Sequence, residues 1–310
     1  MSATYLITGG AGNLACQLTH LLAGPGVRLV LFDRADRPVA DTAAGCIYVQ
    51  GDLSQPADIQ RIVAEQRPQI VLHLGSLLSG SCEADRQRAW QVNADGGFHV
   101  FEAAVAHGVR TLFFPSSLAA YGSPLPDPLP EDFPQWPTGL YGVTKVACER
   151  LGIYYHAKHG LDFRCLRLPA VISRFAPRGA ASAYSSLAFV DGVQQGSYIF
   201  KVNPGTRVST VYVKDALRAM VELVRAPADR LTRRVYNIHA LALSAGEVAE
   251  AVRQRWPNAD LRFEPDPQVA ALIESWPARI VDDSARRDWH WQPSYDLPKL
   301  ADDMIQELRP

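Results

Sequence analysis

The sequence carries no surplus of charge. Its 31 lysines and arginines and its 32 aspartates and glutamates leave a net charge of −1 over 310 residues. A chain this close to neutral has no basic field that would attract nucleic acid or an anionic membrane surface. We therefore expect neither of these as a partner.

The sequence also has little of what disulfide frameworks and metal sites require. Its five cysteines are scattered and odd in number, no two form a Cys-x-x-Cys pair, and its eight histidines show no ligand spacing. The cysteines are Cys16, Cys46, Cys82, Cys148 and Cys165. We expect reduced thiols, no disulfide framework, no zinc site and no other metal.

Long apolar runs are missing as well. No run reaches the length of a membrane span. The start, Met1–Thr4, lacks the basic residues that open a signal peptide. These absences predict a cytoplasmic protein.

What is present is ordinary for a globular enzyme, with 47% apolar and 20% charged residues. The length allows one large domain or two smaller ones that share a core. In the first half, near-continuous apolar runs alternate with helical spacing, which predicts a parallel sheet wrapped by helices. The predicted strands are Tyr5–Ile7, Arg28–Phe32, Cys46–Val49, Ile70–His73 and Thr111–Phe114, and the predicted helices are Leu14–Ala23, Pro56–Gln66 and Ala89–Gly108.

Beyond these elements the pattern becomes less regular. Six prolines between positions 124 and 137 predict an irregular loop, which we expect to form part of a site wall. The elements predicted after it are helices at Tyr141–His159, Val213–Arg225, Ser244–Trp256 and Asp296–Leu308, and strands at Asp162–Leu168 and Val235–Ile238. The fold class predicted is α/β, with a Rossmann-type doubly wound parallel sheet in residues 1–168. We expect a segment around 206–240 to return to that domain, and residues 169–310 to form a smaller substrate-binding domain.

A glycine-rich turn, Gly9–Ala15, lies between the first predicted strand and the first predicted helix. Glycines at this place let the backbone approach a pyrophosphate at the helix N-terminus. An ordinary tight turn is the alternative, but the position directly after the first strand favours nucleotide binding. Candidate cofactor contacts in this turn are Gly9, Gly12, Asn13 and Leu14.

Two carboxylates follow the next strands. Asp33 ends the second strand, where a carboxylate accepts hydrogen bonds from an adenosine ribose. It would repel a 2′-phosphate and so favours NAD over NADP, although Arg34 beside it weakens that argument. Asp52 follows the third strand and either contacts the adenine amino group or caps a helix.

Tyr141 and Lys145 are four residues apart in a predicted helix, so they share one face. An ammonium beneath a phenol favours the phenolate, which can act as a general base toward an alcohol. Ser117 closes the fifth strand, on the edge where such sheets bind ligands, and is our candidate to hold the substrate oxygen. The neighbouring Ser116 is the rival.

Two further polar residues allow two interpretations each. Ser79 follows the fourth strand and either contacts substrate or caps a loop. Asn93, in a predicted helix, serves either structure or a water relay behind Lys145.

Together these residues resemble the extended short-chain dehydrogenase/reductase family, the NAD-dependent epimerases and dehydratases. The resemblance covers nearly the whole chain. Within the family, stretches such as Tyr236–Ile238 and Ser275–Pro277 are most similar to L-threonine 3-dehydrogenases of the short-chain type.

The resemblance implies NAD as cofactor, a small-molecule substrate and a homodimer. It implies that Tyr141 is the catalytic base, with Lys145 and Ser117 as the other catalytic residues. Further NAD contacts that it implies are Leu53, Leu74, Gly75, Ser76, Asn93, Tyr141, Lys145 and Leu168.

The substrate loop departs from the threonine pattern. Threonine dehydrogenases usually have Gly-Thr-Thr-Asp-Tyr there, whereas this chain has Gly-Ala-Ala-Ser-Ala-Tyr at 179–184, which keeps one hydroxyl at Ser182 and loses the acid. That run is similar to erythronate-type dehydrogenases. Arg207 either clamps a substrate carboxylate or is a structural surface residue. The candidate substrate contacts are Ser79, Ser117, Tyr141, Ser182 and Arg207.

The function predicted is NAD-dependent oxidation of the secondary alcohol of a small hydroxy acid, with L-threonine converted to 2-amino-3-oxobutanoate as the first candidate. A sugar-acid dehydrogenase and a nucleotide-sugar epimerase or dehydratase are the alternatives. A non-catalytic NAD-sensing scaffold is a third possibility, which the intact Ser117, Tyr141 and Lys145 disfavour.

Overall fold

The computed structural model describes residues 3–176, 178 and 180–309, so Gly179 of the substrate loop lies outside the described residues. The chain divides into two compact units. The first comprises Met1–Ala120, Gln135–Arg167 and Leu217–Tyr236, and the second comprises Tyr121–Pro134, Leu168–Ala216 and Asn237–Pro310. The chain therefore leaves the first unit and returns to it twice.

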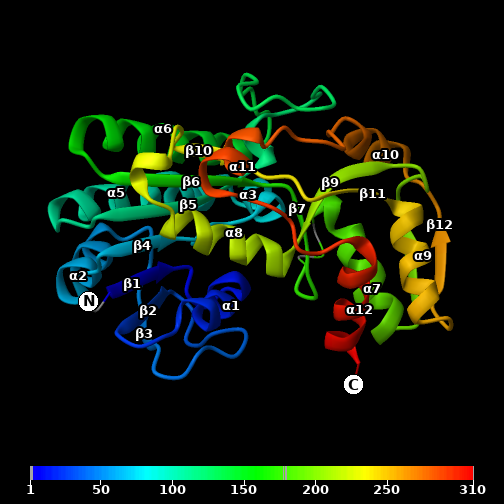
Figure 1. Ribbon diagram of the computed structural model, residues 1–310, viewed down its shortest axis with the longest axis horizontal. Helices are drawn as coiled ribbons and strands as arrows, with labels where there is room; N and C mark the ends of the chain where they lie inside the picture. Colours follow the sequence, from blue (N-terminus) through cyan, green and yellow to red (C-terminus); the bar gives the residue numbers. More distant parts are fainter. Residues whose placement is uncertain (1–2, 177, 179, 310) are drawn as a thin grey trace. The chain divides into compact units, whose positions relative to one another are not determined.

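The first unit is built on a seven-stranded sheet with the strand order β10-β6-β5-β4-β1-β2-β3 (Figure 1). The strands are β1 (Ala3–Thr8), β2 (Val27–Asp33), β3 (Ile47–Gln50), β4 (Ile70–His73), β5 (Thr111–Ser117), β6 (Asp162–Leu168) and β10 (Val235–Asn237). β1 pairs in parallel with β2 and with β4, and the β2–β3 and β4–β5 pairs are parallel too. The predicted α/β fold class with a Rossmann-type sheet is confirmed.

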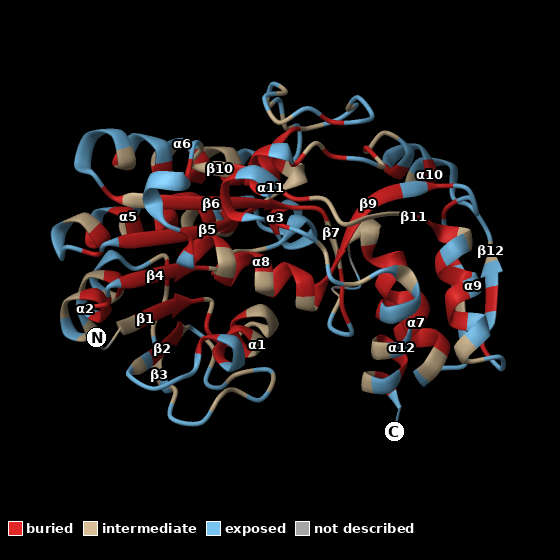
Figure 2. Ribbon diagram, viewed as in Figure 1, coloured by how far each residue is buried: buried red, intermediate tan, exposed pale blue. Residues whose placement is uncertain are grey.

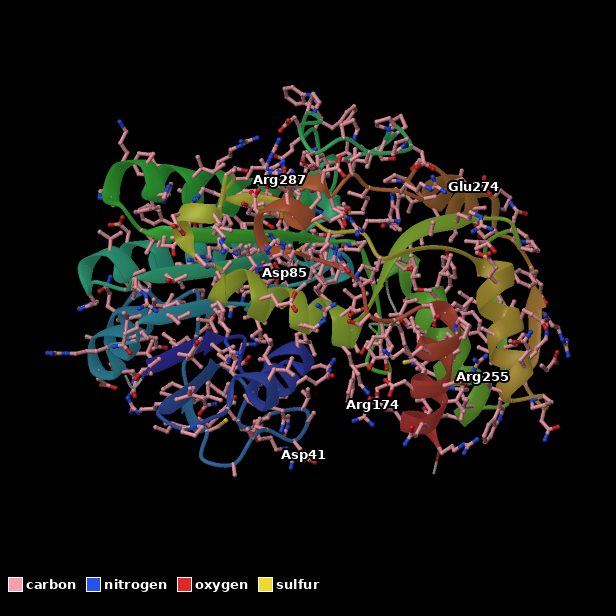
Figure 3. All side chains as sticks on the ribbon, viewed as in Figure 1. Asp41, Asp85, Arg174, Arg255, Glu274 and Arg287 are labelled. Carbon is pink, nitrogen blue, oxygen red and sulfur yellow. The ribbon has the colours of Figure 1, made fainter. Side chains whose placement is uncertain are left out.

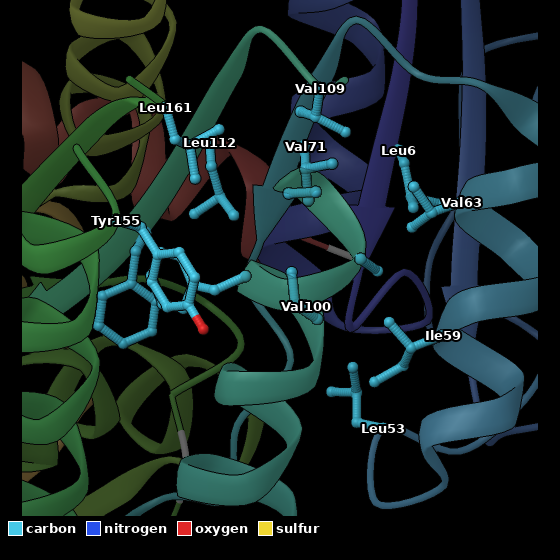
Figure 4. Close-up of a cluster of buried hydrophobic side chains, with 14 of the residues drawn as sticks. Leu6, Leu53, Ile59, Val63, Val71, Val100, Val109, Leu112, Tyr155 and Leu161 are labelled. Carbon is cyan, nitrogen blue, oxygen red and sulfur yellow. The ribbon is translucent and has the colours of Figure 1, made fainter. Parts of the chain in front are cut away.

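Helices cover the sheet because their apolar stripes match the buried strands. β4 is buried along its whole length, and β5 along all but its last residue (Figure 2). Side chains from α2 (Pro56–Gln66), α5 (Gly96–Ala106) and α6 (Leu140–His159) pack on one face, in the cluster of Figure 4 that includes Ile59, Val100 and Tyr155. Each such side chain stabilises the fold by roughly 1.5–3 kcal/mol. α1 (Asn13–Leu22) lies on the opposite face (Figure 1).

The helix predicted over Ala89–Gly108 is not continuous. Its place is taken by α4 (Arg86–Trp90), a π-helical turn η1 (Gln91–Asp95) and α5, after a short α3 (Ser79–Ala84). In the π turn the Gly96 N–H bonds to the Gln91 carbonyl, five residues back. Such a turn inserts one extra residue and commonly marks a functional site.

The second unit holds two small sheets that the sequence did not predict. One has the order β11-β9-β7 and the other pairs β12 with β8. The strands are β7 (Ala170–Ile172), β8 (Ser197–Phe200), β9 (Arg207–Tyr212), β11 (Leu241–Ser244) and β12 (Asp260–Phe263). Its helices are α7 (Tyr184–Gln194), α9 (Ala245–Arg255), α10 (Pro267–Glu274), α11 (Asp283–Trp289) and α12 (Leu297–Leu308).

Two helices of the second unit begin at a capping side chain. The Ser244 side chain forms a capping box with Glu247 at the start of α9, and Asp296 caps α12. Arg255, labelled in Figure 3, ties α9 to Asp302 of α12 at 2.6 Å. α8 (Val213–Arg225) has the predicted bounds, and short 3₁₀ turns occur at η2 (Leu118–Ala120), η3 (Ala181–Ala183) and η4 (Ala228–Arg230).

The first part of the proline-rich loop, Tyr121–Pro134, belongs to the second unit. Its Leu129 forms an isolated parallel bridge with Ile280, and its Asp127 carboxylate accepts a bond from the Arg279 N–H at 2.9 Å. The loop is irregular, as predicted. That it forms a site wall remains a prediction.

All five cysteines are free thiols. Within the described part of the chain, no helix combines the length and apolarity needed to cross a membrane.

Candidate active site

The first unit contains the point at which its sheet changes winding direction. β1 is flanked by β2 on one side and by β4 on the other, so connections from these strands diverge. In open α/β sheets, ligands bind outside the carboxyl ends of the strands at this point. Predicted site residues from β1, β2, β4 and β5 all follow or end these strands.

In the glycine turn, Gly9 and Gly10 leave no room for a side chain. Gly9 has a φ of 68°, and a Cβ there would lie 2.6 Å from the Cα of Gly75. A Cβ on Gly10 would lie 2.7 Å from the Phe32 nitrogen, and one on Gly75 would overlap the Leu53 side chain. The structure thus brings together the predicted cofactor residues Gly9, Leu53 and Gly75.

The N-terminus of α1 is open to an anion. Gly12 is its N-cap residue, and no side chain caps the helix. The first backbone N–H groups of a helix then remain available for a phosphate. Asn13, the first residue of α1, accepts a bond from Gln17 at 2.9 Å, and Leu14 follows it.

The Asp33 carboxylate faces this turn. Its Oδ2 accepts a bond from the Ala11 N–H at 3.1 Å and its Oδ1 one from Ala35 at 3.0 Å. At the end of β4, the Leu74 and Gly75 N–H groups bond to Thr8, the last residue of β1. The close glycines, the open start of α1 and the Asp33 carboxylate together fit a dinucleotide.

Asp52 is occupied by protein groups. Its Oδ1 accepts from the N–H and the hydroxyl of Ser54, and its Oδ2 accepts from Arg88 at 2.6 Å. Burial opposes ionisation of Asp52, but these hydrogen bonds outweigh it and lower the pKa of the carboxyl. Asp52 does not cap α2, whose N-cap residue is Gln55, but ties Arg88 to the segment that precedes α2. An adenine contact of Asp52 remains a prediction.

Asn93 lies in the π turn and is also fully engaged. Its Oδ1 accepts from the Leu77 N–H at 2.7 Å, while its Nδ2 donates to the Leu77 carbonyl and to Thr144. Asn93 therefore joins the loop after β4 to α6. Ser76 in this loop donates to Leu77, and Ser79, exposed, begins α3.

The Tyr141–Lys145 pair has the expected arrangement on α6. Lys145 is buried, its Nζ donates to the Pro115 carbonyl at 2.9 Å, and it lies 5.2 Å from the Tyr141 ring centroid. The same Nζ lies 4.5 Å from the Phe114 ring centroid, a cation–π contact that favours the charged ammonium. Tyr141 is the second residue of α6, where the positive end of the helix dipole favours an anion.

Ser116 and Ser117 differ in their hydrogen bonds. Ser116 is buried and donates to Glu149 Oε1, so its hydroxyl is committed to the protein. Ser117 is half-buried, and its oxygen accepts only a 3.2 Å bond from Ala119 among the bonds seen. Its hydroxyl hydrogen can therefore be given to a ligand, which favours Ser117.

Gly142 holds the turn after Ser117 against the start of α6. A Cβ on Gly142 would overlap the Ala119 carbonyl oxygen, so the two segments are in direct contact. The predicted catalytic residues Ser117 and Tyr141 lie beside this contact in sequence. No pattern in the sequence singled out Gly142.

His73, at the end of β4, is a second residue that the sequence did not single out. It is buried, its Nδ1 bonds to Thr8 Oγ1 at 2.7 Å, and its Nε2 has no hydrogen-bond partner among the residues that the structure describes. Burial, helped by the Lys145 charge, lowers the pKa of His73 to about 3, so the imidazole is neutral. Its ring stacks on Phe114 at 5.8 Å.

Glu149 and Arg167 were also missed. Glu149 is fully buried and accepts two bonds from Arg167, at 2.9 and 2.6 Å. One signal was present, since Glu149 continues the four-residue spacing of Tyr141 and Lys145.

The remaining predicted contacts lie in the second unit. Leu168 ends β6, and Ser182 lies half-buried in η3. Arg207 is half-exposed, pairs with Glu247 at 2.8 Å and donates to the Ala242 carbonyl. These bonds favour its structural role over a carboxylate clamp. Among the residues described here, no three His, Cys, Asp or Glu side chains are grouped so that they could hold a metal.

The sequence and the fold were compared with those of known proteins. Residues 5–238 match the NAD dependent epimerase/dehydratase family. The mitochondrial L-threonine 3-dehydrogenase of Sus scrofa is 36% identical over 97% of this chain and 81% of its own length. An L-threonine dehydrogenase structure from Clostridium difficile superposes with a TM-score of 0.91 at 31% identity, covering 99% of this chain and 98% of the other. A monomeric L-threonine 3-dehydrogenase from a metagenome superposes with a TM-score of 0.88 at 31% identity and 98% coverage of both chains.

Proposed function

The chain belongs to the NAD dependent epimerase/dehydratase family, and on this premise we propose that it oxidises the secondary alcohol of a small hydroxy acid, with L-threonine first. The observation that carries the proposal is the buried Lys145 ammonium, 5.2 Å from the ring of Tyr141 at the N-terminus of α6. The named activity of the relatives from Sus scrofa and Clostridium difficile supports threonine as the substrate.

We propose NAD as the cofactor. When bound, it supplies the acceptor for the two electrons that the alcohol loses. The glycine turn and the open start of α1 would hold its pyrophosphate, and Asp33 its ribose. The further contacts are proposed at Leu53, Leu74, Gly75, Ser76, Asn93 and Leu168.

Three protein residues bind the substrate hydroxyl and remove its proton. Tyr141 takes the proton of the substrate hydroxyl, while the Lys145 charge and the helix N-terminus stabilise the phenolate. Ser117 donates a hydrogen bond to the substrate oxygen and holds it beside Tyr141. General-base catalysis of this kind is worth roughly 10²–10⁴-fold in rate.

Recognition of the rest of the substrate is assigned to the second unit, through Ser182, with Ser79 of α3 as a further contact. Threonine would give 2-amino-3-oxobutanoate. The substrate loop lacks the acidic residue that is usual in threonine dehydrogenases. A sugar acid such as erythronate is therefore the main alternative to threonine as substrate.

A substrate panel tests the proposal. Purified protein and NAD are mixed with L-threonine, erythronate and related hydroxy acids, and NADH formation is followed by absorbance. We expect a signal with at least one of these acids and the highest kcat/KM with threonine. A nucleotide-sugar epimerase would instead interconvert a sugar nucleotide without net NADH. No NADH from any acid, while NAD binds, would reject a dehydrogenase of hydroxy acids.

We also propose a homodimer, formed through the outer faces of α4, α5 and α6. Trp90, Phe98 and Tyr154 are 44%, 44% and 51% exposed there, which is unusual for large apolar side chains. Asp95 and Arg150 line the same face. A two-fold axis could place the acid of one copy near the base of the other.

A further inference from the structure

Glu149 is a buried carboxylate that the reaction described above does not use. Its relative exposure is 0%, and it lies one helical turn beyond Lys145 and two beyond Tyr141 on the same face of α6. A buried ion pair usually contributes little net stability, because desolvation offsets the attraction between the charges. Stability alone therefore does not explain why Glu149 lies one helical turn behind Lys145.

The contacts of Glu149 fix the end of β5. Ser116 donates to its Oε1, while Lys145 donates to the carbonyl of Pro115, the preceding residue. Two consecutive residues of β5 are thus held by two residues of α6. The next residue of the strand is Ser117, whose position depends on both bonds.

The other bonds of Glu149 come from two further segments. Arg167, the penultimate residue of β6, donates from Nε to Oε1 and from Nη2 to Oε2. Gln135 donates to Oε2 at 2.8 Å and is itself bonded to Arg150. Strands β5 and β6, helix α6 and the loop before it all meet at this carboxylate.

The charges around Glu149 determine its electrostatic effect. α6 contributes the Lys145 ammonium and the Cys148 thiol, and β6 contributes the Arg167 guanidinium and the Cys165 thiol. Burial raises the pKa of Cys148 to about 12 and raises that of Cys165 strongly, so both thiols are neutral. Glu149 is therefore the negative charge in a group that otherwise holds two buried cations.

We propose that Glu149 is a positioning residue for the Ser117, Tyr141 and Lys145 site, and that its charge sets the pH at which Tyr141 becomes a base. The proposal rests on the proposed function. Glu149 lies about 12 Å along the helix from Tyr141, at ~1.5 Å per residue. At an effective dielectric constant of ~20, a charge at that distance changes a proton affinity by about one pH unit.

Glu149→Gln keeps the shape of the side chain and removes its charge. The acidic limb of the kcat/KM profile should then move to lower pH by about one unit, because the phenolate loses a repulsive neighbour. Glu65→Gln is the matched control, since Glu65 is an exposed carboxylate on α2 that pairs with Arg61. Its profile should match that of the wild type. No shift in Glu149→Gln, or a shift to higher pH, would overturn the electrostatic role.

Ser116→Ala removes one hydrogen bond to Glu149 and no charge, so it tests whether Glu149 positions the site. It can be measured even if Glu149→Gln fails to fold. We expect kcat to fall about tenfold, because a hydrogen bond to a charged group is lost. The acidic limb of the kcat/KM profile and the affinity for NAD should not change. An unchanged kcat would overturn the positioning role.

A readout that needs no substrate separates this proposal from the proposed function. The protein is labelled with ¹³C at the tyrosine ring Cζ, the Tyr141 signal is assigned with Tyr141→Phe, and it is titrated by NMR with and without NAD. The Tyr141 signal should titrate at lower pH in Glu149→Gln than in the wild type. If the wild type oxidises no hydroxy acid, the proposed function fails, while this titration still decides the role of Glu149.

Discussion

At the scale of single residues, the proposed base Tyr141 depends on the charge of its neighbours. The Lys145 ammonium is held in a buried place by the Pro115 carbonyl and by the face of Phe114. The His73 ring stacks on Phe114 and is neutral, so it adds no second positive charge. The site therefore concentrates one cation beneath Tyr141.

Tyr141→Phe should remove the base and leave the ring in place. We expect kcat to fall roughly 10²–10⁴-fold while NAD affinity changes little, measured by NADH formation and by calorimetric titration with NAD. Tyr154→Phe, an exposed phenol on the same helix, is the control and should retain activity. If Tyr141→Phe keeps near wild-type kcat, another group is the base.

Asp33→Ser should change the choice of cofactor. Without the carboxylate, a ribose loses a charged acceptor and a 2′-phosphate loses a repulsive one. Loss of one charged hydrogen bond predicts a fall of about 10–100-fold in kcat/KM for NAD relative to NADP.

The ratio of the two kcat/KM values is the readout, because Asp33 also bonds to Ala11 and Ala35. Asp36→Ser, in the same loop and exposed, is the control. An unchanged ratio in Asp33→Ser would exclude Asp33 as the ribose contact.

At the scale of elements, a close backbone contact joins the two segments that carry the proposed catalytic residues Ser117 and Tyr141. α6 carries Tyr141, and Ser117 is the last residue of β5, directly before the turn η2. Gly142 lets the Ala119 carbonyl approach the first turn of α6. The same principle operates between Gly9 and Gly75 at the other end of the site.

Gly142→Ala should separate α6 from that turn. The added methyl group meets a backbone oxygen that cannot rotate away, so we expect a loss of about 1–3 kcal/mol in stability and a clear fall in kcat. Thermal denaturation and NADH formation measure the two effects.

Gly139→Ala is the matched control, since the nearest atom to a Cβ there is Glu83 Oε1 at 3.7 Å. Equal behaviour of the two variants would show that the contact at Gly142 does not matter.

At the scale of the whole molecule, buried histidines make stability depend on pH. The pKa of His73 falls from 6.5 to about 3 on folding, so between these values the unfolded chain binds a proton that the folded chain does not. Stability is then at its full value above pH 6.5 and is lost as the pH falls, by up to about 1.4 kcal/mol per pH unit. Burial also lowers the pKa of His99 and His239, which adds loss of the same sign.

His73→Gln should show a shallower loss of unfolding free energy between pH 6.5 and 5 than the wild type. Chemical denaturation at several pH values measures the slope. Carboxylates titrate lower and affect both proteins alike. Identical slopes would mean that His73 is protonated in the folded protein.

The proposed homodimer uses the outer face of α4, α5 and α6. Replacing Trp90 and Phe98 together by Glu should halve the molar mass measured by light scattering, because two desolvated charges replace apolar contacts. Trp136→Glu, at a tryptophan 78% exposed elsewhere in the first unit, should leave the mass unchanged. A wild-type monomer would reject the proposed dimer.

The sequence by itself determined the features that depend on local spacing. Alternating buried strands and amphipathic helices predicted a Rossmann-type parallel sheet, with β4, β6, α2 and α8 at the predicted bounds. The four-residue spacing of Tyr141 and Lys145 needs only one turn of helix, so it too could be predicted. Short-range geometry follows from neighbouring residues alone.

Only the tertiary structure decided the features that depend on residues far apart in the chain. Ser117 is favoured over Ser116 because Glu149, 33 residues on, takes the Ser116 hydroxyl. Arg207 is taken up by Glu247, 40 residues away, and the short strands of the second unit are held by distant partners. Such pairings leave no periodic pattern, because the free energy that fixes them comes from burial and charge after the chain has folded.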